Sequence, residues 1–165
     1  MTTAVFQSLS VLVADDSAYM RQLLASLLHA LGVGEVHVAS DGEQALEYYL
    51  AHEPELVITD AAMKPVDGFT FAEKLRGMDR GMLGMVPIIM VSGHTDQASI
   101  ERARDIGVSE FLSKPVSAKA LYQRLIAAID RPRPFIDSPG YRGPDRRRRS
   151  LPYEGVERRN QVAFI

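Results

Sequence analysis

Cysteine and tryptophan are both absent from this sequence of 165 residues. Without cysteine, the chain can form no disulfide, no thiolate nucleophile and no cysteine-based zinc site. Long apolar runs are absent as well, because none approaches the roughly 18 residues that a membrane span requires. The N-terminal segment, MTTAVFQSLS, lacks the basic start and apolar stretch of a signal peptide. We therefore expect a cytoplasmic protein with no membrane insertion.

Length and charge divide the chain into two unequal parts. A hydrophobic share of 46% over 165 residues suits one domain and an appendage. From residue 131 onward, the chain has nine arginines and four acidic residues, which gives a net charge of +5. The preceding residues carry ten basic and 17 acidic side chains, a net charge of −7. The sequence thus predicts an acidic domain, residues 1–130, followed by a basic tail, residues 131–165.

Within the acidic domain, apolar runs of strand length alternate with helical patterns. The expected strands cover residues 10–15, 36–40, 56–60, 86–92 and 110–115. The expected helices cover residues 17–32, 41–53, 69–78, 96–107 and 117–130. Near-continuous apolar strands separated by helices favour an α/β fold with a doubly wound parallel sheet. In such sheets the ligand site lies outside the carboxyl ends of the strands.

The tail lacks the alternating strand and helix patterns of the acidic domain. Residues 131–165 contain prolines, glycines and scattered apolar residues without a sustained period. The segment is also too short to bury a core of its own. We expect a disordered arginine-rich tail that becomes ordered on ligand binding.

Polar side chains close four of the five expected strands. They are Asp15 and Asp16 at the end of the first strand, Asp60 at the end of the third, Ser92 at the end of the fourth and Lys114 at the end of the fifth. Carboxylates from two strand ends suit Mg²⁺, which prefers a few carboxylates and water. A carboxylate beside that ion can accept a phosphoryl group, because the metal neutralises the repulsion between the two anions. The hydroxyl and the ammonium can then contact phosphoryl oxygens.

In these segments the chain resembles the receiver domains of two-component response regulators, through VADDS, ITDAAMKPVDG, IIMVSGH and FLSKP. The resemblance implies a flavodoxin-like sheet of strand order 2-1-3-4-5. It also implies no enzyme activity beyond Mg²⁺-dependent self-phosphorylation and dephosphorylation at Asp60. Ser92 and Lys114 would read the phosphoryl group, and Phe111 would be the switch aromatic. The implied metal ligands are Asp15, Asp16, Asp60 and the backbone carbonyl of Ala62.

The tail segment YRGPDRRRRS offers chemistry that fits a guanine ligand. Arginine can pair with guanine O6 and N7, stack on a base or clamp a phosphate, and a carboxylate can accept the guanine N–H groups. A tyrosine ring can stack on the base, while glycine and proline shape a tight turn. Cyclic di-GMP, with two guanines and two phosphates, would use all of these groups. The expected contacts are Tyr141, Arg142, Gly143, Pro144, Asp145, Arg146, Arg147 and Arg148.

The layout of the whole chain resembles CheY-like proteins with an arginine-rich extension. The resemblance implies that the protein binds cyclic di-GMP and then modulates the flagellar motor, motility or surface attachment. The implied partner is a flagellar motor switch protein, which would dock on residues 99–129 and recruit the protein to the motor.

Other interpretations stay open. The chain could be a phospho-accepting response regulator in a histidine kinase relay, with the tail serving only to dock a partner. The tail could also lie on the acidic domain, or serve only solubility. Binding to RNA or DNA by counterion release would require neither Asp145 nor the Gly-Pro turn, so we expect no nucleic-acid ligand.

Overall fold

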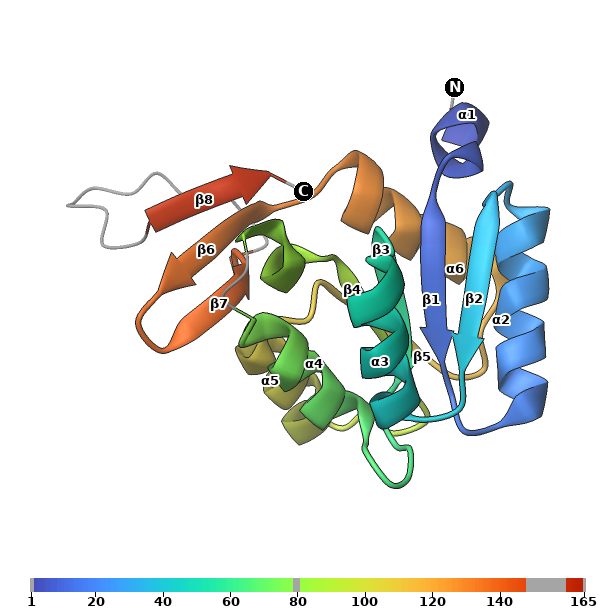
Figure 1. The fold of residues 1–165 in the computed structure, drawn as a ribbon, viewed down its shortest axis with the longest axis horizontal. Helices are drawn as coiled ribbons and strands as arrows, with labels where there is room; N and C mark the ends of the chain where they lie inside the picture. The colour runs from blue at the N-terminus through green and yellow to red at the C-terminus, as the bar shows by residue number, and fades with distance from the viewer. Residues whose placement is uncertain (1, 79–80, 148–159, 165) are drawn as a thin grey trace.

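The computed structural model describes residues 2–78, 81–147 and 160–164. Its central sheet contains β1 (Ser10–Ala14), β2 (Glu35–Ala39), β3 (Leu56–Asp60), β4 (Ile88–Ser92) and β5 (Glu110–Ser113). Neighbouring strands are parallel, in the order β2-β1-β3-β4-β5. The predicted fold class, a doubly wound five-stranded parallel sheet with flavodoxin-like strand order, is confirmed (Figure 1).

Helices connect the strands and cover both faces of the sheet (Figure 1). Their bounds are α1 (Thr2–Gln7), α2 (Ala18–Ala30), α3 (Gly42–His52), α4 (Gly68–Arg76), α5 (Gln97–Ile106) and α6 (Ala118–Leu125). A 3-10 helix, η1 (Gly81–Met85), precedes β4, and a π-helical turn, η2 (Ile126–Asp130), continues α6. The sequence patterns predicted neither α1 nor η1. Among the described residues, no helix is both long enough and apolar enough to cross a membrane.

Two apolar layers hold the helices on the sheet. Residues of α3, α4 and α5 pack on one face, while residues of α2 and α6 pack on the other. Every residue of β3 and β4 is buried, as expected for central strands covered on both sides. The carboxyl ends of β1, β3, β4 and β5 therefore meet at one edge of a sheet with little freedom to move.

Side-chain caps fix where the five longer helices after β1 begin. In each case an oxygen of the residue before the helix accepts a backbone N–H from the first turn. These residues are Ser17, Asp41, Asp67, Asp96 and Ser117. A cap of this kind stabilises a helix by about 1 kcal/mol. The cap at Ser17 also fixes the chain directly after the acidic pair that closes β1.

The residues after Asp130 form a second, antiparallel sheet. It contains β6 (Pro134–Ser138), β7 (Tyr141–Pro144) and β8 (Asn160–Phe164), in the order β7-β6-β8. A two-residue Pro-Gly turn joins β6 to β7, and Gly140 has a positive φ of 85° there. The prediction of a tail without regular structure therefore differs from the structure at these three strands. The remaining tail residues, 148–159 and 165, lie outside the described residues.

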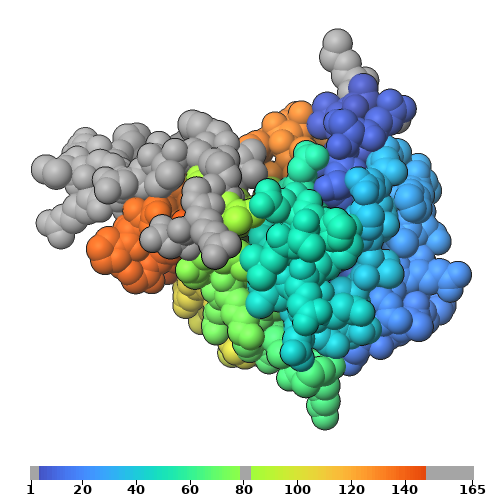
Figure 2. Space-filling view, viewed as in Figure 1, coloured from blue at the N-terminus to red at the C-terminus, as the bar shows by residue number. Residues whose placement is uncertain are grey.

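The hairpin of β6 and β7 buries its apolar side chains against the domain. Phe135 and Ile136 are almost fully buried, and the guanidinium of Arg76 at the end of α4 lies 5.3 Å from the centre of the Phe135 ring. Figure 2 shows the orange hairpin lying beside the green surface of α4. The short length of the tail did not prevent this packing, because the hairpin lies against the domain and does not have to enclose a core of its own.

Arg76 ties three segments of the domain together beneath this hairpin. Its Nε donates to the carbonyl of Gly107 at 2.9 Å, and its Nη1 donates to the carbonyls of Gly84 and Val86 at 2.9 and 2.7 Å. Burial lowers the pKa of the Arg76 guanidinium to about 10. The end of α4, η1 and the turn before β5 thus share one buried cation.

Candidate functional site

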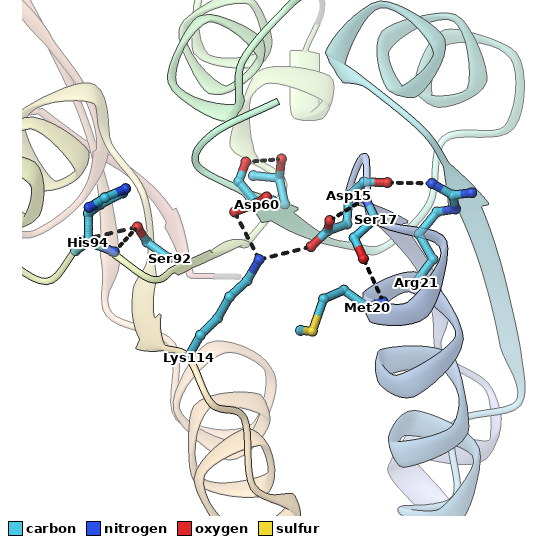
Figure 3. A network of polar contacts seen from close by, with 9 residues as sticks. Asp15, Ser17, Met20, Arg21, Asp60, Ser92, His94 and Lys114 are labelled. Carbon is cyan, nitrogen blue, oxygen red and sulfur yellow. Dashed lines mark hydrogen bonds and ion pairs between the residues drawn. The ribbon is translucent and has the colours of Figure 1, made fainter. Parts of the chain in front are cut away.

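An acidic cluster lies at the carboxyl edge of the central sheet. Asp15 and Asp16 follow β1 and Asp60 ends β3, so two adjacent parallel strands bring the three carboxylates together. Figure 3 shows two of them, Asp15 and Asp60. One ligand oxygen from each lies within 4.8 Å of the others. Asp15 and Asp60 are buried, whereas Asp16 is exposed. This donor set fits Mg²⁺, whose preferred ligands are carboxylate oxygens and water.

Lys114 brings a positive charge to the same cluster. Its Nζ lies 3.3 Å from Asp15 Oδ2 and 3.4 Å from Asp60 Oδ1, so the ammonium bridges the two buried carboxylates. Lys114 follows β5, an edge strand that β3 and β4 separate from β1. The ammonium therefore reaches the acids from across the strand ends (Figure 3). The structure brings together the acids and the lysine that were predicted from their positions at strand ends.

Three further groups position the acids, and the sequence patterns gave them no role. The backbone N–H of Ser17 donates to Asp15 Oδ1 at 2.8 Å, and Arg21 Nη1 donates to the backbone carbonyl of Asp15 at 2.7 Å. The hydroxyl of Thr59 donates to the backbone carbonyl of Asp60 at 3.0 Å. Arg21 lies on the first turns of α2, one helical turn after the cap at Ser17. The four-residue spacing between Ser17 and Arg21 was the sequence signal that places Arg21 on the same helix face as the cap, near Asp15.

The environment of Asp60 raises the pKa of its carboxyl above the usual value. Burial is the larger cause, and the nearby carboxylate of Asp15 adds to it. The ammonium of Lys114 and a backbone N–H at Ala62 act in the opposite direction. An additional cation at this site would favour the ionised form of Asp60, which is the form that can act as a nucleophile.

Ser92 and Phe111 lie on the neighbouring strands, β4 and β5. The Ser92 hydroxyl accepts the N–H of His94 at 2.9 Å and donates to the His94 carbonyl at 3.1 Å. Phe111 is half-buried and packs against the core. Contact of Ser92 with a phosphoryl group and a switching role for Phe111 stay predictions.

The family model of the response regulator receiver domain matches residues 11–126. The chain belongs to this family. Receiver domains are phospho-accepting signalling modules of two-component systems and are generally not enzymes. They bind Mg²⁺ at an acidic cluster, which here is Asp15, Asp16 and Asp60, and they interact with histidine kinases. The matched segment ends before the hairpin of β6 and β7.

Two relatives of the chain support its assignment to the receiver family. The transcriptional regulatory protein PdtaR of Mycobacterium tuberculosis is 34% identical over 121 residues, which are 73% of this chain but 57% of that protein. The chemotaxis protein CheY of Bacillus subtilis is 32% identical over 121 residues, which are 73% of this chain and 94% of CheY.

Solved structures show the same receiver architecture. The chemotaxis protein CheY4 of Vibrio cholerae superposes with a TM-score of 0.67 at 28% identity, over 73% of this chain and 98% of CheY4. A chain of the CheX-CheY-BeF3-Mg complex from Borrelia burgdorferi gives a TM-score of 0.66 at 25% identity, over 72% of this chain and 87% of its own length. This receiver is therefore CheY-like in its fold.

The extension comprises the tail residues that follow the receiver, from residue 131 onward. Its predicted ligand residues contact the receiver or one another. Arg142 is half-buried: its Nη1 donates to the backbone carbonyls of Arg76 and Met78 at 2.9 and 2.7 Å, and its Nε lies 3.4 Å from Asp137 Oδ1. The hydroxyl of Tyr141 donates to the Pro144 carbonyl at 2.6 Å. Arg142 thus binds the carbonyls at the end of α4, where a helix favours a positive charge.

Arg146 and Arg147 are the exposed members of the predicted ligand set among the described residues. The guanidinium of Arg146 lies 4.6 Å from the centre of the Tyr141 ring, and its Nη1 lies 3.1 Å from Asp105 Oδ1 on α5. The Arg147 guanidinium pairs with the carboxylate of Asp145, at 2.9 Å for its Nη2. The interpretation that the basic tail lies on the acidic domain agrees with the contact between Arg146 and Asp105. Arg148 lies outside the described residues.

Gly143 lies in close backbone contact with Gly107 of the receiver. A side chain at Gly143 would place its Cβ 2.5 Å from the Cα of Gly107, so neither position can carry a larger residue without movement. Pro144 is buried beside it. The predicted turn residues Gly143 and Pro144 thus pack against the receiver in this structure.

Proposed function

We propose that Asp60 of this receiver accepts a phosphoryl group in a Mg²⁺-dependent step. The observation that carries the proposal is the bridging of Asp15 and Asp60 by the Lys114 ammonium beside a third carboxylate. Two buried acids this close need a positive charge, and a phosphoryl group would bring further negative charge to the same place. A site with this arrangement is suited to an anion that arrives together with a divalent cation.

The proposed reaction uses a carboxylate oxygen of Asp60 as the nucleophile. That oxygen attacks the phosphorus of the donor, a new O–P bond forms, and the donor's own bond to phosphorus breaks, with its electron pair leaving on the donor. Bound Mg²⁺ would neutralise charge on the phosphoryl oxygens. Asp16, Asp60 and the carbonyl of Ala62 would hold the ion, with Asp15 acting through water. Lys114 and Ser92 would then contact the transferred group.

Phosphorylation with a small acyl phosphate and Mg²⁺ tests this proposal directly. We expect the intact protein to gain one phosphoryl group, detected by gel retardation and mass spectrometry, and we expect Asp60→Asn to gain none. Asp67→Asn is a matched control, since Asp67 caps α4 and lies outside the acidic cluster. Equal labelling of the Asp60→Asn protein would refute the assignment.

A second proposal concerns the extension: it binds cyclic di-GMP. The observation that favours it is the stacking of the Arg146 guanidinium on the Tyr141 ring, with Arg147 next to it along the chain. Stacked arginine and tyrosine groups suit a ligand with planar bases and phosphates. The proposed contacts are Tyr141, Arg142, Gly143, Pro144, Asp145, Arg146, Arg147 and Arg148.

Isothermal titration of cyclic di-GMP tests the second proposal. We expect micromolar or tighter binding by the intact protein and at least tenfold weaker binding by Arg146→Ala. Arg131→Ala is the control, because Arg131 is an exposed arginine of the same extension. Substitutions are preferable to removal of residues 131–165, which would also remove the buried Phe135. Equal affinity of the Arg146→Ala protein would exclude this site, and a steep salt dependence without nucleotide preference would indicate nucleic acid instead.

The output that we propose is control of the flagellar motor, through a motor switch protein that docks on residues 99–129. A hollow of about 190 Å³ on this face is lined by receiver residues Ile100, Arg104 and Phe111 and by extension residues Arg133 and Arg146. A partner that docks here would contact both parts of the chain. Co-sedimentation with a purified motor switch protein, with and without cyclic di-GMP, tests this output. No binding in either condition would favour the alternative, a histidine kinase relay in which the extension docks another partner.

A further inference from the structure

We propose that the docked hairpin of β6 and β7 is a latch that couples ligand binding on the extension to phosphorylation at Asp60, so that each event favours the other. This inference rests on the second proposal, the binding of cyclic di-GMP. It adds that the ligand and the receiver compete for the same arginines. The hairpin would therefore leave its docked position when the ligand binds.

The competition follows from the contacts of two arginines. Arg142 donates to the carbonyls of Arg76 and Met78, and Arg146 pairs with Asp105 on α5. Both arginines use their Nη1 atoms for these contacts, so a guanine or phosphate that takes the Nη1 side of either guanidinium displaces its receiver partner. We propose that the ligand engages this side of Arg142 and Arg146, which weakens the polar contacts of the extension with α4 and α5.

The second half of the coupling runs through α5 and β5. The hairpin contacts Gly107 at the end of α5, and Arg146, after β7, pairs with Asp105 on the same helix. Arg133, just before β6, donates to the carbonyl of Ser109, just before β5. The opposite ends of these elements reach the phosphorylation site. The loop from Ser92 leads into α5, and Lys114 follows β5.

Phosphorylation would disturb the docked state at these elements. The Ser92 hydroxyl now bonds both backbone groups of His94, and contact with a phosphoryl oxygen requires it to release at least one of them. A shift in that loop displaces α5. The contact at Gly107 leaves no room for displacement, because a Cβ there would lie 2.1 Å from the Arg142 carbonyl oxygen. We therefore expect a phosphoryl group to loosen the latch and, by thermodynamic reciprocity, the ligand to favour phosphorylation.

The first test is titration of cyclic di-GMP in the absence and presence of beryllofluoride with Mg²⁺, a mimic of the phosphorylated state. We expect about fivefold to tenfold tighter binding with the mimic, within the usual range of allosteric coupling. Asp105→Asn should tighten binding without the mimic, since it releases Arg146. Glu101→Gln is the control on the same helix, where the carboxylate accepts a hydrogen bond from Gln97, and it should leave the affinity unchanged. Equal or weaker binding with the mimic would overturn the latch.

A second measurement separates failure of the latch from failure of the nucleotide proposal. Amide hydrogen exchange in residues 134–144 is followed with and without beryllofluoride and Mg²⁺, in the absence of nucleotide. We expect the mimic to accelerate exchange in the hairpin of the intact protein, and Asp105→Asn to do so alone. Faster exchange without any nucleotide binding would leave the latch standing and remove cyclic di-GMP as its ligand. Unchanged exchange in both proteins would overturn the latch whatever the nucleotide does.

Discussion

Gly107 and Gly143 face each other so closely that neither position has space for a side chain. A Cβ at Gly107 would lie 2.1 Å from the Arg142 carbonyl oxygen, and a Cβ at Gly143 would lie 2.5 Å from the Cα of Gly107. Gly107 ends α5 with a φ of 103°, and Gly143 lies in β7. The extension and the receiver therefore meet backbone to backbone, which a loosely held tail would not do.

Gly107→Ala should displace the hairpin from the receiver. The strain of a positive φ and the clash with Arg142 act together, and we expect a loss of roughly 2–4 kcal/mol in the free energy of unfolding. Urea denaturation gives that loss, and proteolysis within residues 134–144 reports undocking. Gly140→Ala is the matched control, since Gly140 also has a positive φ, 85°, but faces open space. Equal losses in the two proteins would show that the close contact has no energetic role.

Replacement of Arg76 by methionine should strongly destabilise the receiver. The change leaves the carbonyls of Gly84, Val86 and Gly107 without the donor that they have now, and each buried acceptor left unsatisfied costs about 1–3 kcal/mol. Urea denaturation measures the loss. Arg131→Met, at an exposed arginine, should change stability by less than about 0.5 kcal/mol. A small effect at Arg76 would mean that water replaces the guanidinium without penalty.

Lys114→Met should impair both the charge balance and the chemistry of the acidic cluster. Without the ammonium, the pKa of Asp60 rises further, because a cause that now lowers it disappears. The rate of phosphorylation by a small acyl phosphate should fall by about 10²-fold, as expected for loss of one preorganised charged donor. Carbon NMR titration follows the Asp60 carboxyl, and Lys119→Met on the exposed surface of α6 serves as control. An unchanged pKa and rate would contradict a role for this ion pair.

Asp60 makes stability depend on pH and on Mg²⁺. Its pKa is raised in the folded state, so ionisation is less favourable there than in the unfolded chain. The resulting penalty is absent below the ordinary carboxyl pKa and develops as pH rises through the raised value. Asp60→Asn should therefore raise Tm at pH 7, by roughly 2–4 °C for each kcal/mol recovered, with a smaller gain at pH 3.5.

The same comparison with added Mg²⁺ checks the metal site. Mg²⁺ should raise Tm of the unsubstituted protein at pH 7, because an ion that binds only the folded state stabilises it. Asp60→Asn removes one carboxylate of the cluster, so its Tm should respond less. If Asp60→Asn raised Tm equally at pH 7 and at pH 3.5 without Mg²⁺, the gain would come from the loss of another interaction and not from the raised pKa of Asp60.

The receiver fold could be predicted from sequence because its signals are local. Apolar runs mark the five strands, and polar caps such as Ser17 and Asp96 mark helix starts. The acidic cluster followed from a general property of parallel sheets, that their carboxyl ends share one edge. Asp15, Asp60 and Lys114 lie where that rule puts them.

The docked hairpin lacked such signals. Phe135 and Ile136 are buried in succession, so β6 shows no alternation, and the partners of Arg142 lie 66 and 64 residues earlier in the chain. Only the Pro139-Gly140 turn pointed to two paired strands. Arg76 was equally hidden, because an arginine at a helix end usually lies on the surface.

The burial of Phe135 over Arg76 has a consequence for folding during synthesis on the ribosome. The ribosome releases the chain from its N-terminus, so every strand of the receiver sheet emerges before β6 does. Until residue 144 is free, the surface that later packs against Phe135 and Ile136 faces water. A nascent chain that stalls at Asp130 would therefore leave the Arg76 end of α4 without the hairpin that covers it, open to contact with other proteins in the cell.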